Sequence, residues 1–200
     1  MTPQLSVVPA SPAPTSGIAP LRNITALASL ISRTQNRPSH LPGLATFSGY
    51  SGFGKSFAAA HAAGQFRAYY VEARSVWSRK SMLTTILRQQ GIVPAGTVAE
   101  MVEQVAEQLV LSRRPLIIDE FDHVVQRNLV ELVRDIYEQS QGTVILIGEE
   151  ALPGKLRRWE RFHGRMFDWV RAAPYSLADA VALARPYSPA LAIPQALLSR

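Results

Sequence analysis

Two hydrophobic periods alternate along the chain. Short runs rich in β-branched and aromatic residues are predicted as strands and lie at 44–47, 68–72, 116–119, 144–147 and 166–170. The runs at 116–119 and 144–147 are almost continuously apolar, which is typical of parallel strands covered on both faces. Apolar residues at helical spacing fill the segments between the runs. Strand and helix therefore alternate from about residue 43 to 172, which predicts an α/β fold with right-handed crossovers.

The helical pattern is clearest where start or stop signals accompany it. A short helix is predicted before the first strand, with the apolar face Ile24, Leu27, Ala28 and Ile31. A capping box at 97–100 opens another helix, whose apolar residues are Val98, Val102, Val105 and Leu109. A third stripe ends near Gly142 and predicts one helix with Val125, Leu129, Leu132, Val133 and Ile136.

The ends of the chain differ from its middle. Residues 1–20 contain no charged side chain and five of the 14 prolines, which predicts a flexible leader rich in Pro, Ala and Ser. Residues 21–175 carry the alternating pattern and form the predicted core domain. A helix start at Ser176 leads into 176–200, where we expect the beginning of a small helical lid that is short or truncated.

Composition excludes several classes of protein. The chain has no cysteine and four histidines, so a disulfide scaffold, a thiolate zinc site and a cysteine nucleophile are ruled out. The longest apolar stretches are about six residues, well short of the ~20 that span a bilayer. The N-terminus also lacks the basic start of a secretory signal. We therefore expect a soluble, cytoplasmic protein with no membrane partner.

The charge balance is basic. Lys and Arg total 21 against 15 for Asp and Glu, which gives a net charge of +6. Most of these cations are arginine, whose planar guanidinium suits bidentate contacts with phosphate oxygens. An arginine-rich composition is equally expected from a GC-rich genome. The positions of the arginines therefore have to decide between the two interpretations.

A phosphate-binding loop follows the first predicted strand. The pattern G-x-x-x-x-G-K-[ST] is met at every required position by Gly49, Tyr50, Ser51, Gly52, Phe53, Gly54, Lys55 and Ser56. An Ala-rich helix begins at Phe57, so successive backbone N–H groups and a helix N-terminus converge on one anion. We expect the eight residues of the pattern and Phe57 to contact ATP, with Lys55 at the β- and γ-phosphates and Ser56 on Mg²⁺.

Two adjacent acids end the third predicted strand. Asp119 and Glu120 follow the apolar run 116–118 and are placed at the edge of the sheet where α/β proteins bind ligands. We expect Asp119 to hold Mg²⁺ through its water shell and Glu120 to orient and deprotonate the attacking water. Asp122 is predicted as a helix N-cap or a solvated acid rather than a third catalytic group.

These motifs together resemble an AAA+ ATPase, and within that class the Mu B-type transposition proteins of transposable phages. The resemblance covers residues 40–185 and rests on G-Y-S-G-F-G-K-S, V-E-A-R-S-V-W-S-R-K, L-I-I-D-E-F-D and V-I-L-I-G-E-E followed by an Arg-rich segment. It implies a three-layer P-loop NTPase of the AAA+/ASCE type with a five-stranded parallel sheet. One departure stands at the end of the fourth strand, where AAA+ proteins usually carry an Asn, Ser or Thr sensor and this chain has Gly148 and Glu149. An ionised Glu149 cannot donate a hydrogen bond, so it would contact the nucleotide through water.

The Arg-rich segment from 155 to 171 carries six basic residues against two acids. The resemblance implies that this segment faces a neighbouring subunit and supplies an arginine finger, for which Arg165 is the first candidate and Arg161 the second. A homo-oligomer, as a helical filament or a ring, follows from this interpretation. The alternative is a solvated helix face that also packs Trp159, Phe162 and Trp169.

A second basic group follows the second predicted strand. The resemblance implies that Arg74, Arg79 and Lys80, which lie beside Trp77, face double-stranded DNA. Cations with few base-reading groups nearby would bind the phosphate backbone without sequence preference. The alternative places Trp77 in the core, with the three charges flanking a helix that starts at Ser78.

By resemblance, the chain is expected to capture target DNA in an ATP-dependent manner and to activate a DDE transposase. A helicase loader would share these features and differ in its partner. A P-loop kinase or nucleotide switch without DNA, and a DNA-binding module with an inactive ATPase, are the alternatives from other classes. Glu120 favours water as the phosphate acceptor, and no obvious Arg-rich lid interrupts the predicted sheet.

Overall fold

The computed structural model describes residues 21–176 and 179. Residues Arg22–Tyr175 form one compact unit, and the chain ends belong to a second unit. In that second unit, the backbone N–H and the hydroxyl of Ser176 both donate to Oδ2 of Asp179 at 2.7 Å, as at the start of a helix. The predicted leader 1–20 and the rest of the predicted lid 176–200 lie outside the described residues.

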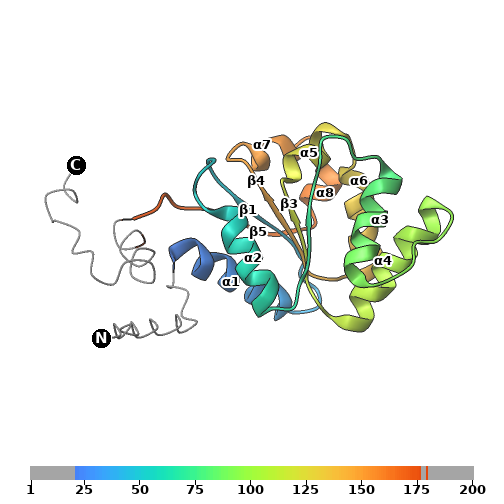
Figure 1. Ribbon diagram of the computed structural model, residues 1–200. Coiled ribbons are helices and arrows are strands. Elements are labelled where there is room, and N and C mark those ends of the chain that lie inside the picture. Colours follow the sequence, from blue (N-terminus) through green and yellow to red (C-terminus); the bar gives the residue numbers. More distant parts are fainter. Residues whose placement is uncertain (1–20, 177–178, 180–200) are drawn as a thin grey trace, which may run out of the picture. The chain divides into compact units, whose positions relative to one another are not determined.

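Five parallel strands form a single sheet in the compact unit (Figure 1). They are β1 (Leu44–Ser48), β2 (Tyr69–Glu72), β3 (Leu116–Asp119), β4 (Val144–Gly148) and β5 (Met166–Arg171). Their order across the sheet is β2-β3-β4-β1-β5, and every pair is parallel. The predicted α/β fold with a five-stranded parallel sheet is confirmed. The order puts β4 between the strand that precedes the phosphate loop and the strand that ends in the acid pair.

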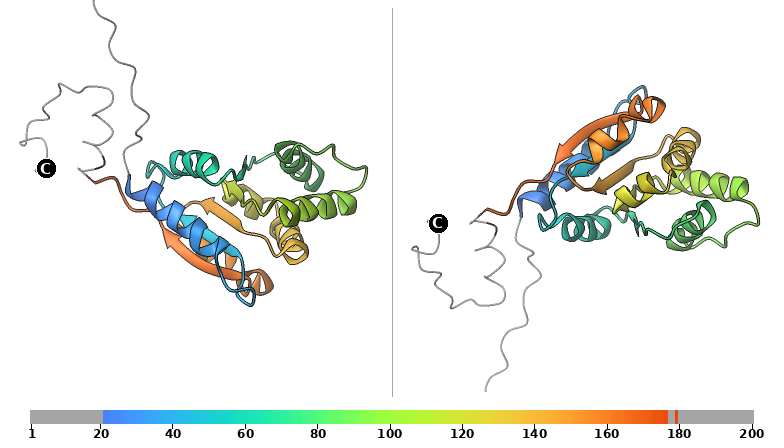
Figure 2. Two further views of the ribbon diagram at one scale, coloured as in Figure 1. Left: turned by 90° about the horizontal axis from the view of Figure 1, so that it is seen from below. Right: turned by 90° about the horizontal axis from the view of Figure 1, so that it is seen from above.

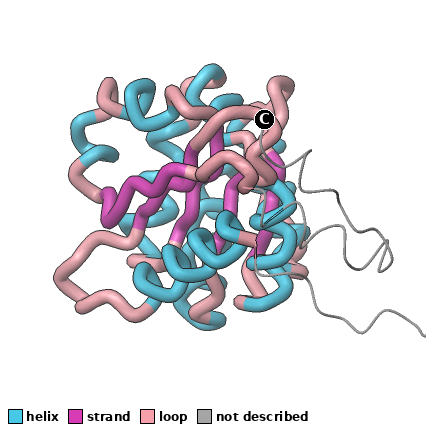
Figure 3. Tube along the Cα trace, turned by 90° about the vertical axis from the view of Figure 1, so that its left-hand side faces the viewer, coloured by secondary structure: helices cyan, strands magenta, loops and turns pink. Residues whose placement is uncertain are grey.

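Helices cover the sheet on both faces (Figure 3). They are α1 (Arg22–Gln35), α2 (Lys55–Gln65), α3 (Arg79–Gln90), α4 (Val98–Ser112), α5 (Phe121–Gln126), α6 (Val130–Ser140), α7 (Leu152–Leu156) and α8 (Glu160–His163). Helix α1 packs on β1 and β5, and it lies alongside β5 in both views of Figure 2. Helix α2 packs on α1, β2 and β3. Helix α4 packs between α3 and α6.

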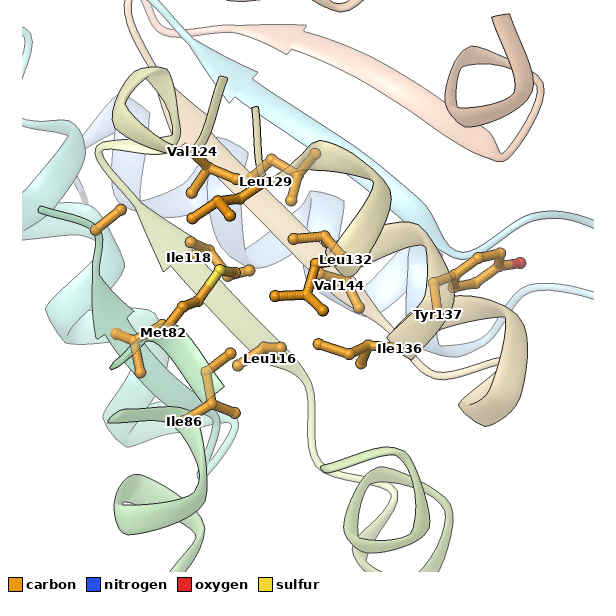
Figure 4. Packing of buried hydrophobic residues seen from close by; sticks show 14 of the residues in the cluster. Met82, Ile86, Leu116, Ile118, Val124, Leu129, Leu132, Ile136, Tyr137 and Val144 are labelled. Carbon is orange, nitrogen blue, oxygen red and sulfur yellow. The ribbon is translucent and has the colours of Figure 1, made fainter. Parts of the chain in front are cut away.

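Side chains along each strand point alternately to the two faces of the sheet, so each strand contributes to two buried layers. Leu116 and Ile118 of β3 join a cluster with residues of α3, α4 and α6. Figure 4 shows them with Met82 and Ile86 of α3 on one side and Leu132 and Ile136 of α6 on the other. Ile117 lies between Leu116 and Ile118 and is fully buried, but outside that cluster, so it belongs to the opposite face. Burying such a side chain stabilises the fold by about 1.5–3 kcal/mol. Both faces of the sheet are therefore closed, and the polar groups of the chain gather at the strand ends.

The predicted single helix from Val125 to Ile136 is wrong. Helix α5 ends at Gln126 and α6 begins at Val130. Between them, Asn128 has a φ of 54°, a left-handed conformation that Asn adopts more readily than most residues. The N–H groups of Asn128 and Leu129 close the end of α5 by donating to carbonyl oxygens of its last turns. The apolar stripe continues across the break because Leu129 stays in the core.

Candidate functional site

The predicted phosphate loop lies between β1 and α2, as the pattern requires. Gly52 and Gly54 have φ values of 84° and 71°, a region that costs residues with a Cβ about 1–2 kcal/mol. Gly54 also precedes the first residue of α2, so the free N–H groups of that helix start at the loop. The Nζ of Lys55 donates to the carbonyl oxygens of Gly49 and Tyr50, both at 2.8 Å. The loop is thus a concave backbone with its lysine held along its rim.

Asn23 of α1 fixes this loop from outside the motif. Its Nδ2 donates to the carbonyl oxygens of Phe53 and Ala173, both at 2.7 Å, and its Oδ1 accepts from the N–H of Ala173 at 2.9 Å. The side chain is buried. One amide therefore connects the phosphate loop to the segment after β5. Sequence analysis missed this residue, and its only signal is an Asn that adjoins the apolar face of a helix.

Aromatic side chains stand around the loop. Tyr50, Phe57 and Tyr175 remain 57%, 47% and 41% exposed, respectively. A Cβ at Gly54 would overlap the hydroxyl of Tyr175, so this ring lies directly against the loop. A hydrogen bond to Glu150 raises the pKa of Tyr50, and the negative charge of Glu150 acts in the same direction. Sequence analysis included Tyr50 and Phe57 among the ATP contacts but missed Tyr175.

The acid pair ends β3 at the same edge of the sheet. Asp119 is buried, and its Oδ1 accepts from the N–H of Glu120 at 2.8 Å. Its Oδ2 accepts from the hydroxyl of Tyr70 on β2 at 2.9 Å. Tyr70 was not predicted as a site residue. Its pKa is raised by burial and then by the charge of Asp119, so Tyr70 stays a neutral donor near neutral pH.

Glu120 lies at the same end of the sheet as the phosphate loop. Its φ of 52° turns the chain sharply out of β3, and its side chain is only partly buried. Burial raises the pKa of Glu120, the charge of Asp119 raises it further, and the ammonium of Lys55 opposes both. Because β3 and β1 are parallel and separated only by β4, the second acid and the loop lysine lie at the same end of the sheet.

The side chains at this edge fit a nucleotide-bound magnesium ion. Ser56 in the first turn of α2 and Asp119 supply oxygen donors, which Mg²⁺ prefers. Over the described part of the chain, no three His, Cys, Asp or Glu side chains gather into a metal-binding group. A Mg²⁺ ion held here would therefore take most of its ligands from water and phosphate, as is usual for this ion.

Asp122 does not have the predicted role. It is neither an N-cap nor solvated, and it contacts the end of β4. Asp122 is buried, its Oδ2 accepts from the N–H of Glu149 at 2.6 Å, and its Oδ1 pairs with Nζ of Lys155 at 2.6 Å. The N-cap position of α5 is Glu120, so Asp122 lies within the first turn and points toward β4. A Cβ at Gly148 would overlap the Asp122 carboxylate. Gly148 is therefore required by packing, and the space of a sensor side chain is filled by Asp122.

Glu149 projects from this strand end. Its side chain is 64% exposed, and its Oε2 accepts from Nζ of Lys155 at 3.0 Å. The N–H of Gly49 donates to the carbonyl oxygen of Gly148 at 3.2 Å, so the end of β4 adjoins the loop. Contact between Glu149 and a nucleotide stays a prediction.

The predicted finger residue Arg165 lies at the amino end of the strands, whereas the loop lies at their carboxyl end. The carbonyl oxygen of Arg165 accepts from the N–H of Leu44 at the start of β1, and the loop begins after the end of that strand. A five-residue strand spans roughly 16 Å. The guanidinium of Arg165 pairs with Glu138 at 2.9 Å, and both side chains are largely exposed. Arg161 and Arg165 both line a groove of about 820 Å³ over α4 and α6.

The three predicted DNA-contacting residues are exposed, but they are not one cluster. Arg79 lines the same groove as Arg161 and Arg165, whereas Arg74 and Lys80 do not. The Nζ of Lys80 donates to the carbonyl oxygen of Gly96 at 3.3 Å. Trp77 between them is 6% exposed and belongs to the core. The core interpretation of Trp77 is therefore correct, and DNA contact by the three cations stays a prediction.

A parallel sheet in this order, with a phosphate loop after β1 and an acid pair after β3, defines a P-loop NTPase fold. Within that class, residues 39–156 match the family model described as an AAA domain. This is more than half of the chain, and the chain belongs to this family. No curated protein matches the chain in sequence.

Solved structures show the same fold. The Aeropyrum pernix ORC2 protein, solved in ADPNP and ADP complexes, superposes with a TM-score of 0.65 at 16% identity, over 87% of this chain and 54% of that one. Cdc6p from Pyrobaculum aerophilum gives a TM-score of 0.59 at 15% identity, over 90% of this chain and 52% of the other. The chain thus spans about half the length of either protein. None of the helices in residues 21–176 is long and apolar enough to cross a membrane.

Proposed function

We propose that the chain is an ATP-dependent, DNA-binding AAA+ ATPase. The observation that carries this proposal is that the phosphate loop after β1 and the acid pair after β3 lie at the same end of one parallel sheet. A cation for the phosphates and a base for water thus meet at one edge of the sheet. The ORC2 structure with ADPNP and ADP supports adenine nucleotides as ligands of this fold.

In this proposal the residues of the loop and of the acid pair have separate roles. Backbone N–H groups of residues 49–56 bind the phosphates, and Nζ of Lys55 leaves two loop carbonyls to contact the β- and γ-phosphates. Ser56 and Asp119 hold Mg²⁺, which would neutralise charge that develops on the phosphates. Glu120 accepts a proton from the attacking water, and its raised pKa suits a base that works near neutral pH.

An oligomer completes the proposed site. Arg165 and Arg161 lie about one strand length from the loop of their own subunit, so they would act on the nucleotide of a neighbour. Release of Arg165 from its exposed ion pair with Glu138 costs little, because exposed pairs contribute about 0–1 kcal/mol. Mixing Lys55→Ala subunits with Arg165→Ala subunits tests this arrangement. Partial recovery of ATP turnover supports a finger acting between subunits, and additive loss contradicts it.

Arg74, Arg79 and Lys80 are the proposed contacts to duplex DNA. All three are exposed and lie after β2, Arg74 before and Arg79 and Lys80 after the core residue Trp77. Contacts of this kind address phosphates and predict binding without sequence preference that weakens steeply with salt. Activation of a DDE transposase is the role that the resemblance to Mu B-type proteins favours. A helicase loader remains the second candidate, because the AAA fold and the nucleotide site suit both roles.

The decisive experiment measures ATP turnover and filter binding of unrelated duplexes at low salt, with and without a non-hydrolysable ATP analogue. We expect binding that requires the analogue, and turnover that DNA stimulates. If DNA does not change ATP turnover and the analogue does not promote DNA binding, the kinase or switch alternative is supported instead. If Glu120→Gln changes neither turnover nor the residence time on DNA, the ATPase is inactive. Electron microscopy of the protein on DNA then tests for a filament or a ring.

A further inference from the structure

A small basic groove lies beside the edge strand β5, and none of its lining residues has been given a role in the proposed function. It has a volume of about 330 Å³ and is lined by Ser48, Pro153, Arg157, His163, Trp169 and Arg171. We propose that this groove binds a phosphodiester of a nucleic-acid strand. The inference rests on the DNA-binding part of the proposed function and gives it a second contact surface.

The alternation of β5 builds the groove. Asp168 points to the side of α1, where its Oδ2 pairs with Arg33 at 2.7 Å. Trp169 and Arg171 point to the other side, because neighbouring residues of a strand face opposite ways. The ring of His163 lies 5.1 Å from the ring of Trp169 and closes one wall. The only acid of this strand is therefore neutralised on the far face, and the groove receives an indole and a guanidinium.

The cations of the groove are available for a ligand. Within residues 21–176, the side chains of Arg157 and Arg171 form no ion pair and no hydrogen bond, and both are exposed. No carboxylate lines the groove, although Glu160 lines an adjoining recess of about 270 Å³ with Arg157 and His163. Two guanidinium groups without partners and without a lining acid form a site for an anion.

The larger groove over α4 and α6 provides the contrast. Its charged lining residues are Arg79, Arg134, Arg161 and Arg165, together with Glu103, Glu131, Asp135 and Glu138. Arg134 and Arg165 are already paired with acids of that groove. Equal numbers of positive and negative groups make it nearly neutral. In the smaller groove, by contrast, Arg157 and Arg171 stand without any lining acid.

The lining favours a polynucleotide over a small free anion. Arginine forks bind phosphate oxygens, while an indole beside them offers an apolar surface to a sugar or a base. The groove adjoins the nucleotide site, because Ser48 immediately precedes the phosphate loop and the charge of Arg171 acts on Tyr50.

The groove is well separated from the DNA contacts proposed after β2. Strands β2 and β5 are the two edges of the sheet, and four spacings of about 4.8 Å separate them, which is roughly 19 Å. Substitutions at one edge therefore leave the other edge intact. This separation allows the two surfaces to be tested independently.

The test uses the full chain with the ATP analogue and measures fluorescence anisotropy of a labelled duplex and a labelled single strand across a salt series. The variant is Arg157→Gln/Arg171→Gln, and its control is Arg88→Gln/Arg158→Gln, which removes the same charge from exposed positions outside the groove. We expect the groove variant to bind DNA at least tenfold more weakly. We also expect its slope of log affinity against log salt to fall by about two. The control should retain most of the affinity.

A second variant separates the effect of the bidentate guanidinium geometry from the effect of the positive charge. Arg157→Lys/Arg171→Lys keeps both charges, so it should keep the wild-type salt slope. Its DNA affinity should lie between those of Arg157→Gln/Arg171→Gln and the wild type, because lysine cannot form the two parallel hydrogen bonds of a guanidinium. Binding of a fluorescent ATP analogue and the melting temperature should stay at the wild-type values for both variants.

The possible results separate the two proposals. If wild-type protein binds DNA and the groove variant binds equally well, the groove inference is overturned and the proposed function stands. If the groove variant keeps DNA binding but loses turnover, and added Lys55→Ala subunits restore that turnover, the groove serves a neighbour's nucleotide, which also overturns the inference. If wild-type protein binds no DNA in any nucleotide state, the DNA-binding function itself is wrong.

Discussion

The hydroxyl of Tyr70 donates to Oδ2 of Asp119 across two neighbouring strands, at a distance of 2.9 Å. Asp119 is buried, and its other oxygen already accepts from the N–H of Glu120. Both oxygens of the proposed metal-binding acid are thus oriented by the chain itself. Groups that orient a metal-binding carboxylate affect metal affinity although they do not touch the metal.

Tyr70→Phe should therefore raise the Mg²⁺ concentration that gives half-maximal ATP turnover by about tenfold. The loss of one hydrogen bond to a charged group should also lower the stability by about 1.5–3 kcal/mol. Tyr69→Phe is the control, because its hydroxyl accepts from Gln108 and lies on the other face of β2. An unchanged Mg²⁺ requirement in Tyr70→Phe would show that Asp119 needs no help from β2.

Gly148→Ala should destabilise the protein by about 1–3 kcal/mol, since its Cβ would overlap the carboxylate of Asp122 and the side chain of Leu152. Gly154→Ala should instead be neutral or stabilising by up to about 1 kcal/mol. Gly154 lies in α7, is exposed and has no atom near the new Cβ. Chemical denaturation of the two variants measures the difference. Equal stabilities would mean that Asp122 moves freely away from β4.

Gly54→Ala should weaken nucleotide binding strongly. A Cβ there meets the hydroxyl of Tyr175, and the φ of 71° adds about 1–2 kcal/mol of backbone strain. Gly64→Ala in the same helix has open space around its Cβ and should bind nucleotide normally. Adding Tyr175→Ala to Gly54→Ala removes the collision but not the strain. Calorimetric titration with ATP should then find partial recovery, and full recovery would mean that the φ is not costly.

Glu120 makes stability and turnover respond to pH in opposite ways. Its folded pKa lies above the ordinary value of 4.5, so the folded state binds more protons than the unfolded state between those two values. Stability contributed by the protonated carboxyl is present below that window and is lost as the pH rises through it. Turnover should increase over the same window, because the ionised carboxylate is the proposed base.

Glu120→Gln should abolish turnover, retain ATP binding and melt at a higher temperature than wild type at pH 7. The difference in melting temperature should disappear below about pH 4, where the wild-type carboxyl is protonated in both states. Glu107→Gln, at an exposed position of α4, should show neither effect. A melting difference that stays constant with pH would mean that ionisation of Glu120 does not affect stability.

Much of the fold follows from local sequence. The apolar runs gave every strand to within about two residues, because buried parallel strands need continuous apolar segments. The capping box at Thr97 likewise starts α4 where expected. The break between α5 and α6 did not follow, since Asn128 interrupts the helix through its backbone while the apolar spacing continues. The strand order was also beyond local pattern, because it depends on how the crossovers pack.

The candidate site likewise contains residues that local sequence predicts and residues that only the fold brings together. The loop and the acid pair are contiguous motifs and could be predicted directly. Asn23, Tyr70 and Tyr175 reach the site from other elements, and only the fold brings them there. Asp122 was misinterpreted because its partners, the N–H of Glu149 and Lys155, lie 27 and 33 residues away. Sequence spacing identifies residues that act from one segment, and it misses groups that meet across segments.

The two carbonyl oxygens that hold the ammonium of Lys55 give the loop a built-in competitor for its own ligand. Each such charge-assisted hydrogen bond contributes about 1.5–3 kcal/mol, so an incoming anion has to replace roughly 3–6 kcal/mol of internal contacts. A singly charged anion such as chloride, with one binding atom, offers too little in exchange. A chain of phosphoryl groups offers many oxygen atoms along the same rim. If the loop binds phosphates as proposed, charge density and length together, rather than negative charge alone, set what it selects.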